Sequence, residues 1–298
     1  MAGPAAPFGR NLTAMITPMT GDGAIDYEGA ARLAEYLVED MRNDGLVISG
    51  TTGESPTTTD AEKARLLRAV VEAVGDRIPV VAGVGTNSTA HSIELARAAH
   101  EAGASGLLVV TPYYNRPPQS GLVAHFSAVA DATPLPVLLY DIPGRTATPI
   151  DTPTLLRLAE HPRIVGVKDA KADLLAGSEV MARTKLVYYC GDDPLNLPWL
   201  SVGACGMISV HAHVIGDRLH EMVEAYTGGR VADALAIHRE VLPVYRGMTR
   251  AQGVIMAKAA LHLLGLPGGP VRLPLVDATP AEIDQLREDL TAGGVKIR

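Results

Sequence analysis

Eight short apolar segments rich in Val, Ile and Leu recur along the sequence, and they constrain the fold more than any other feature. They predict strands over residues 12–16, 45–49, 79–84, 106–110, 136–140, 164–167, 186–189 and 206–210. Between them lie segments with the apolar spacing of helices, such as 60–74 and 90–104. Strands that are apolar throughout and alternate with helices form a parallel sheet buried on both faces. Eight such units predict an α/β fold, the (β/α)8 TIM barrel.

The pattern changes after Gly228 and Gly229. Strand signals stop there, and three helical stretches follow at 231–246, 252–264 and 280–290. A segment rich in Gly and Pro, 265–274, separates the last two. We therefore predict a barrel that carries the active site over residues 1–229 and a C-terminal three-helix extension over 230–298. We expect the extension to pack on the barrel or on a neighbouring subunit, and we prefer a role in closing the core.

Composition argues against several kinds of partner. The net charge is −7, from 26 Lys and Arg against 33 Asp and Glu, and no basic run could bind a nucleic-acid backbone. No apolar stretch reaches the roughly 18 residues that a membrane span needs. The two cysteines, Cys190 and Cys205, lack CxxC spacing, and the first ten residues lack the pattern of a secretory signal. We expect a cytoplasmic protein.

Lys168 lies at the end of the sixth apolar segment. Period-two alternation puts it on one face with Gly166 and Ile164, and the missing side chain of Gly166 is expected to leave room for the lysine stem. Burial that lowers the lysine pKa by about three units costs the charged form about 4 kcal/mol. The resulting neutral amine can form a Schiff base with a carbonyl substrate and stabilise an enamine. The structural alternative is an ion pair with Asp169 or Asp141.

Polar residues crowd the segments directly after the other strands, which is where active sites of such barrels lie. Tyrosine hydroxyls linked through a threonine can transfer protons, and Tyr140, Tyr114 and Thr52 are candidates for this relay. Arg145 follows a Pro-Gly turn and suits the capture of a substrate carboxylate. Each of these residue types also serves structure alone, as a core cap, a turn or a surface ion pair.

Three other functions remain as alternatives. A metal-dependent aldolase would use His211 and His213 after the eighth strand, but no third histidine follows another strand, so we expect no metal. A nucleotide-binding loop at 83–88 lacks its third glycine. A non-catalytic keto-acid sensor would have no need of a neutral amine beside a proton relay.

Six motifs, in order along nearly the whole chain, resemble those of the dihydrodipicolinate synthase family. They are GTTGE at 50–54, TPYYNRP at 111–117, LYDIPGRT at 139–146, GVKD at 166–169, GDD at 191–193 and GMISV at 206–210. N-acetylneuraminate lyase belongs to the same broader group of pyruvate-dependent lyases. Arg145, in the loop after Tyr140, is the feature that resembles the synthases in particular.

The resemblance implies a reaction that needs no cofactor. Pyruvate would form a Schiff base with Lys168, and the enamine would attack L-aspartate 4-semialdehyde to give 4-hydroxy-2,3,4,5-tetrahydrodipicolinate. This is the first committed step of diaminopimelate and lysine biosynthesis. Another Schiff-base aldolase or lyase of the family, acting on a different aldehyde, is the alternative.

The resemblance also implies roles for individual residues. Tyr140 would donate and accept protons, Thr52 would link it to Tyr114, and Arg145 would hold the semialdehyde carboxylate. The remaining expected substrate-binding residues are Thr51, for the pyruvate carboxylate, Ile208, through its backbone carbonyl, and Gly191. Tyr114 would cross into the neighbouring subunit's site in a homotetramer, a dimer of tight dimers.

Inhibition by lysine is expected to be weak or absent. Ser55, Asn87 and Tyr113 resemble residues of the family's lysine-inhibition site. Three other positions, Asp60, Lys63 and His91, stand where feedback-sensitive members tend to carry histidines and a glutamate. The positive charge of Lys63 would repel the ammonium group of the effector.

Overall fold

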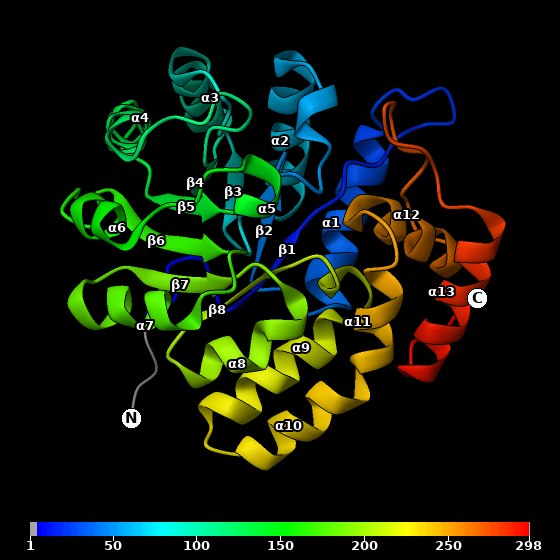
Figure 1. The fold of residues 1–298 in the computed structure, drawn as a ribbon. Helices are drawn as coiled ribbons and strands as arrows, with labels where there is room; N and C mark the ends of the chain where they lie inside the picture. Colours follow the sequence, from blue (N-terminus) through cyan, green and yellow to red (C-terminus); the bar gives the residue numbers. More distant parts are fainter. Residues whose placement is uncertain (1–4, 298) are drawn as a thin grey trace.

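The computed structural model describes residues 5–297, in which eight parallel strands close into a barrel (Figure 1). Each strand pairs with the next along the chain, and β8 pairs with β1. The strands are β1 (Asn11–Ala14), β2 (Gly45–Ile48), β3 (Val80–Gly83), β4 (Gly106–Val110), β5 (Val137–Asp141), β6 (Ile164–Asp169), β7 (Val187–Cys190) and β8 (Gly206–Ser209). The predicted TIM barrel is confirmed. Residues 1–4 and 298, which complete the two predicted domains, lie outside the described residues.

Helices alternate with the strands and form the outer ring of the barrel (Figure 1). They are α1 (Tyr27–Glu39), α2 (Asp60–Val74), α3 (Thr89–Glu101), α4 (Gln119–Asp131), α6 (Thr152–Leu158), α7 (Leu174–Arg183), α8 (Asn196–Ser201) and α9 (Ala212–Thr227). Short helical turns lie in the loops after β2, β5 and β7, namely η1 (Ser55–Thr57), α5 (Pro143–Thr146) and η2 (Asp193–Leu195). No helix within residues 5–297 is long and apolar enough to cross a membrane.

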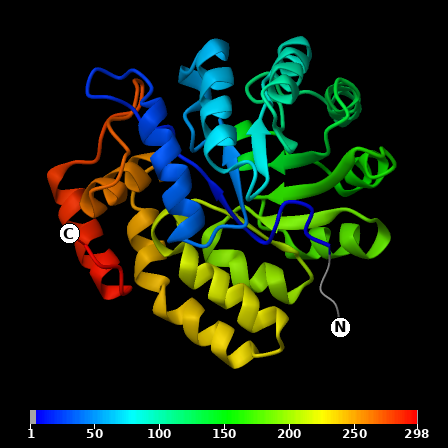
Figure 2. The ribbon, with the colours of Figure 1, turned by 180° about the vertical axis from the view of Figure 1, so that it is seen from behind.

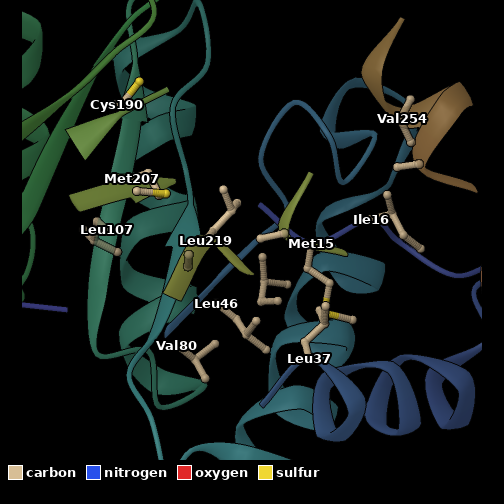
Figure 3. Packing of buried hydrophobic residues seen from close by; sticks show 14 of the residues in the cluster. Met15, Ile16, Leu37, Leu46, Val80, Leu107, Cys190, Met207, Leu219 and Val254 are labelled. Atoms are coloured by element: carbon tan, nitrogen blue, oxygen red, sulfur yellow. The ribbon is translucent and has the colours of Figure 1, made fainter. Parts of the chain in front are cut away.

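Two apolar layers hold the barrel together. The outer layer lies between strands and helices, and Figure 3 shows part of it, with Leu46, Val80 and Leu107 on strands and Leu37 on α1. The inner layer fills the barrel with side chains such as Val47, Val81, Leu108 and Leu138. Side chains pointing both inward and outward are therefore buried, which explains why the strands are apolar throughout. The filled interior leaves the rim at the carboxyl ends of the strands for chemistry.

The C-terminal region of the described chain contains four helices and not the three predicted. They are α10 (Val231–Glu240), α11 (Leu242–Met248), α12 (Gly253–Leu264) and α13 (Pro280–Ala292). The predicted helix 231–246 divides at Val241, because Pro243 has no backbone N–H and starts a new helix in its first turn. The four helices lie together on one side of the barrel in both views (Figures 1 and 2).

Candidate active site

Lys168 is buried at the carboxyl end of β6. Lys168 is only 4% exposed, and its Nζ lies 4.4 Å from the centre of the Tyr140 ring. Burial lowers the pKa of Lys168 to about 8, although the negative charge of Asp193 opposes the shift. A pKa near 8 leaves a usable fraction of neutral, nucleophilic amine at physiological pH.

The two carboxylates proposed as ion-pair partners of Lys168, Asp169 on β6 and Asp141 on the paired strand β5, have other partners. Asp141 is paired with Lys171, whose Nζ lies 3.2 Å from a carboxylate oxygen of Asp141. The Asp169 carboxylate accepts hydrogen bonds from the backbone N–H groups of Lys171 and Ala172, at 3.0 and 2.9 Å. The alternative of an ion pair between Lys168 and either aspartate is therefore wrong, and the amine stays available for chemistry.

Gly191 provides space for the stem of Lys168. A Cβ added to Gly191 would lie 2.9 Å from the lysine Cε, whereas the three atoms nearest to a Cβ added at Gly166 belong to Val187 and Leu138. The expected role of Gly166 stays a prediction. Gly191 was expected to bind substrate. In the structure it makes room for the Lys168 stem, because any larger residue would displace that stem.

A shift of strand register changes which residues share a face with Lys168. Ile164 lies opposite Val137 and Gly166 lies opposite Leu138, so β6 holds one extra residue, Val165, between them. As a result Ile164 joins the outer apolar layer, whereas Val165 packs against the inner one. The prediction that Ile164 and Lys168 share a face is wrong, because simple alternation cannot anticipate a bulge.

A cavity of about 220 Å³ opens beside Tyr140 at the carboxyl ends of β2 to β5. Its lining combines apolar walls with hydroxyl groups and one guanidinium. The lining residues are Ser49, Gly50, Thr51, Ser55, Pro56, Gly83, Gly85, Leu108, Val110, Tyr113, Tyr140, Ile142, Arg145 and Thr146. This position agrees with the place of active sites in such barrels.

The structure brings Thr51, not Thr52, to Tyr140. The Thr51 side chain is hydrogen-bonded to the Tyr140 hydroxyl and also lines the cavity. Burial raises the pKa of Tyr140 to about 12, so its hydroxyl is a protonated donor at neutral pH. Thr52 is buried in the same turn but is not among the residues that line the cavity. Thr51 is thus the threonine beside Tyr140, and the part of either threonine in proton transfer stays a prediction.

Tyr114 does not reach the cavity of its own chain. It is 90% exposed, and its backbone φ of 74° lies in the left-handed region, which is strained for a bulky residue. Strain of this kind persists where the surrounding structure imposes it. The relay expected from Tyr140, Thr52 and Tyr114 is consequently incomplete in one chain.

The other two expected substrate-binding residues differ in their surroundings. Arg145 is exposed at the cavity on the short helix α5, and its charge contributes to lowering the pKa of both Tyr140 and Lys168. Ile208 lies in β8 with its side chain in the inner apolar layer and does not line the cavity. The contribution of its backbone carbonyl to substrate binding stays a prediction.

Sequence reasoning did not single out Asp193 as a site residue. Its buried carboxylate accepts hydrogen bonds from Asn196, Ser209, Val210 and His211. Burial acts to raise the pKa of Asp193, but the charge of His211, together with the hydrogen bonds from His211, Ser209 and Val210, holds it below its usual value. Asp193 is thus a fixed negative charge near Lys168. Its place in the loop that follows β7 is the sequence feature that could have identified it as a site residue.

The two histidines of the metal alternative have structural partners. The His211 ring Nδ1–H donates a hydrogen bond to the Asp193 carboxylate at 2.6 Å, and the His213 ring nitrogen Nε2 accepts one from the backbone N–H of Ile16 at 3.1 Å. Within residues 5–297 no three His, Cys, Asp or Glu side chains are grouped to hold a metal ion. These histidines therefore connect β8 to its surroundings.

A closed (β/α)8 barrel with a buried lysine at a strand end, beside a tyrosine that lines a cavity, defines the class of Schiff-base-forming lyases. The model of the Dihydrodipicolinate synthetase family matches residues 7–293, and the chain belongs to this family.

Individual relatives agree with this assignment. The 4-hydroxy-tetrahydrodipicolinate synthase of Acidothermus cellulolyticus is 66% identical over 97% of this chain and 94% of its own length. A lysine-bound structure of the enzyme from Cyanidioschyzon merolae is 40% identical and has a TM-score of 0.94, with 98% and 100% of the two chains covered. The chloride-inhibited enzyme of Acinetobacter baumannii, complexed with pyruvate, is 34% identical with a TM-score of 0.93 over 97% and 100%.

Proposed function

We propose that the chain condenses pyruvate with L-aspartate 4-semialdehyde to form 4-hydroxy-2,3,4,5-tetrahydrodipicolinate. The observation that carries this proposal is the buried Lys168, whose pKa is lowered to about 8, beside the Tyr140 ring and at the mouth of the barrel. The family to which the chain belongs and the names of its relatives support the choice of substrates.

The reaction begins when the neutral Nζ of Lys168 attacks the ketone carbon of pyruvate and water leaves. The Schiff base then withdraws electrons, so that the pyruvate methyl group loses a proton and becomes an enamine. The enamine carbon attacks the aldehyde of the second substrate. The amine of that substrate next attacks the former ketone carbon, which closes the ring and releases Lys168.

Proton transfer is assigned to Tyr140 and Thr51. The Tyr140 hydroxyl is protonated at neutral pH, as any tyrosine with a pKa of 10 or above is, so it can donate to the departing oxygen and then recover a proton. Thr51 holds this hydroxyl through its hydrogen bond. Arg145, exposed at the cavity, is placed to bind the carboxylate of the semialdehyde through charge-assisted hydrogen bonds.

We further propose that Tyr114 completes the relay in a neighbouring subunit of a homotetramer. Its nearly full exposure and its strained backbone support this role. A subunit-mixing experiment tests it with Lys168→Met and Tyr114→Phe chains. If sites are shared, mixed dimers contain one intact site and regain activity that neither variant has alone. No gain on mixing, with mixed assembly verified by native mass spectrometry, contradicts the proposal.

Reduction by borohydride in the presence of pyruvate tests the central step. We expect a mass increase on the peptide that contains Lys168, and formation of product when the semialdehyde is added. Pyruvate that stays free in the treated enzyme would contradict the proposed function. The setting we propose is the cytoplasm, which suits the two buried cysteines, Cys190 and Cys205, neither of which is in a disulfide.

A further inference from the structure

A buried ion pair connects the C-terminal helices to the turn that follows β2. Lys258 of α12 is 4% exposed and Glu54 is 3% exposed, and the lysine Nζ lies 2.6 Å from the Glu54 Oε1. The lysine Nζ also donates a hydrogen bond to the carbonyl of Pro270 at 2.6 Å. The second carboxylate oxygen, Oε2, accepts from the backbone N–H of Arg272 at 2.8 Å. Both oxygens of Glu54 therefore contact the C-terminal region.

Glu54 also contacts Thr51 through its own backbone. The Glu54 N–H donates a hydrogen bond to the Thr51 carbonyl at 3.1 Å, and the Gly53 carbonyl accepts one from Thr17 at 2.7 Å. The φ of Glu54 is 54°, in the left-handed region, where a residue other than glycine is strained. Such a turn keeps its shape when surrounding contacts hold it. The ion pair with Lys258 is a buried contact from outside the barrel that holds this turn in shape.

Arg272 holds the next part of the same loop. Its guanidinium donates to the carbonyls of Thr57 and Gly23, at 2.8 and 2.9 Å, and forms an ion pair with Glu62 at 2.6 Å. Figure 2 shows this C-terminal loop, in orange, beside the blue loop that contains Gly23. The helical turn η1, which supplies Ser55 to the cavity wall, is thus held between α2 and the C-terminal loop.

We propose that Glu54 and Lys258 are positioning residues for proton transfer in the active site. Their ion pair sets the place of Thr51, whose side chain is hydrogen-bonded to Tyr140, and the Tyr140 ring lies 4.4 Å from the Nζ of Lys168. This inference rests on the proposed function and adds to it a determinant that lies outside the barrel.

Two physical considerations favour positioning over stability as the role of this pair. A buried ion pair is seldom a net source of stability, because apolar residues of the same shape often serve as well. In contrast, displacement of a catalytic group by about 1 Å can lower a rate on the order of 100-fold. A pair that fixes the strained turn next to Thr51 therefore has its larger effect on the rate.

The variant Lys258→Met tests the proposal, because it keeps the length of the stem and removes the charge. We expect kcat to fall roughly 10- to 100-fold, while the KM for pyruvate changes less than about threefold. Hydrogen exchange, followed by mass spectrometry without substrate, should become faster in the peptide covering residues 50–57. The variant Glu54→Gln keeps an oxygen for the Arg272 N–H and should show the same effects in weaker form. The double variant Glu54→Gln/Lys258→Met should lose no more kcat than the single variant with the larger loss, because both substitutions break the same ion pair.

Asp289→Asn is the matched control. Asp289 of α13 pairs with Arg246 of α11 at 3.2 Å and with Arg250, between α11 and α12, at 2.6 Å, so both partners belong to the C-terminal region and not to the turn after β2. We expect it to lower the thermal midpoint and to leave kcat and the exchange of residues 50–57 unchanged. If Asp289→Asn and Lys258→Met lower the thermal midpoint equally and also lower kcat equally, the inference is overturned.

Failure of the inference and failure of the proposed function are distinguishable. If the wild type forms a borohydride-trapped pyruvate adduct but Lys258→Met matches it in both kcat and exchange, the positioning role is refuted and the function stands. If the wild type forms no adduct, the proposed function is refuted. In that case faster exchange of residues 50–57 in Lys258→Met would still support the link between α12 and the turn, and unchanged exchange would refute it.

Discussion

Two lysines of this chain are buried to the same extent, each 4% exposed, yet their surroundings differ. Lys258, in the C-terminal region, has a carboxylate 2.6 Å away and a carbonyl to which it donates. Lys168, in the barrel mouth, forms no ion pair in the part of the chain that the structure describes, and its Nζ lies 4.4 Å from the centre of the Tyr140 ring. Burial alone therefore does not make a reactive lysine.

The difference lies in what balances the cost of burial. Desolvation lowers the pKa of both lysines, but at Lys258 it is opposed first by hydrogen bonding and charge from Glu54. At Lys168 the opposing charge, that of Asp193, is itself engaged by four neighbouring residues, and the pKa falls to about 8. The same amino acid is thus a structural cation in one region and a nucleophile in the other.

Removal of Lys168 should have the largest effect on catalysis. Lys168→Met removes the nucleophile, so turnover is expected to fall by at least about 10³-fold, with no mass increase on borohydride reduction with pyruvate. Its thermal midpoint should not decrease, because no charged partner is left behind. A pyruvate adduct that persists in this variant would show that another residue is the nucleophile.

The same substitution at Lys258 sharpens the comparison. Lys258→Met leaves Glu54 buried without its cation, so we expect a loss of about 3 kcal/mol in the free energy of unfolding, measured by denaturant titration. If Lys168→Met lowered the free energy of unfolding as much as Lys258→Met does, the contrast between the two sites would disappear.

Substitutions of the two adjacent threonines should separate their roles. Thr51→Val removes the hydroxyl bonded to Tyr140 and is expected to lower kcat on the order of 100-fold. Thr52→Val is the matched control and should lower kcat by less than about tenfold. The measurement is steady-state turnover with both substrates. A larger loss in Thr52→Val would restore the order expected from the sequence.

Substitution of Arg145 should impair the use of the semialdehyde and leave the reaction with pyruvate unaffected. Loss of a charge-assisted hydrogen bond costs about 1.5 to 3 kcal/mol, so Arg145→Ala should lower kcat/KM for the semialdehyde roughly 10- to 100-fold. The rate of pyruvate trapping on Lys168 should change by less than about threefold. A comparable loss in trapping would contradict this division of roles.

Schiff-base formation should follow the titration of Lys168. Since the neutral amine is the nucleophile and the pKa is about 8, the initial rate of adduct formation should rise about tenfold between pH 7 and pH 9 and then level off. Trapping by cyanoborohydride across this range measures the rate. A rate that still rises steeply above pH 10 would indicate a lysine with an ordinary pKa and would remove the contrast with a solvent-exposed amine.

The smallest effect is expected from added L-lysine. Asp60 lies 2.9 Å from His91 and 3.9 Å from Lys63, so its carboxylate is already engaged and Lys63 keeps a cation in this region. We expect activity to change by less than about twofold at sub-millimolar L-lysine. Half-inhibition at a sub-millimolar concentration in a steady-state assay would contradict this expectation.

Much of the fold could be predicted because its signals are local. Each strand reads as a short apolar run, and all eight lie within two residues of the predicted segments. Tyr140 and Lys168 were found because residues after such strands meet at one rim. The helix 231–246 was predicted too long because the apolar spacing continues across Pro243, although the ring of that residue starts a new helix.

The sequence by itself determined the order of strands and helices and the residue types at the carboxyl rim, since both depend on periodicity and position along the chain. Only the tertiary structure decided that Gly191 houses the stem of Lys168, that Thr51 meets Tyr140, and that Glu54 reaches Lys258. These contacts depend on a bulge, a left-handed turn and the packing of distant segments. Such features arise from the closed barrel as a whole, because no local pattern specifies which side chains it brings within reach.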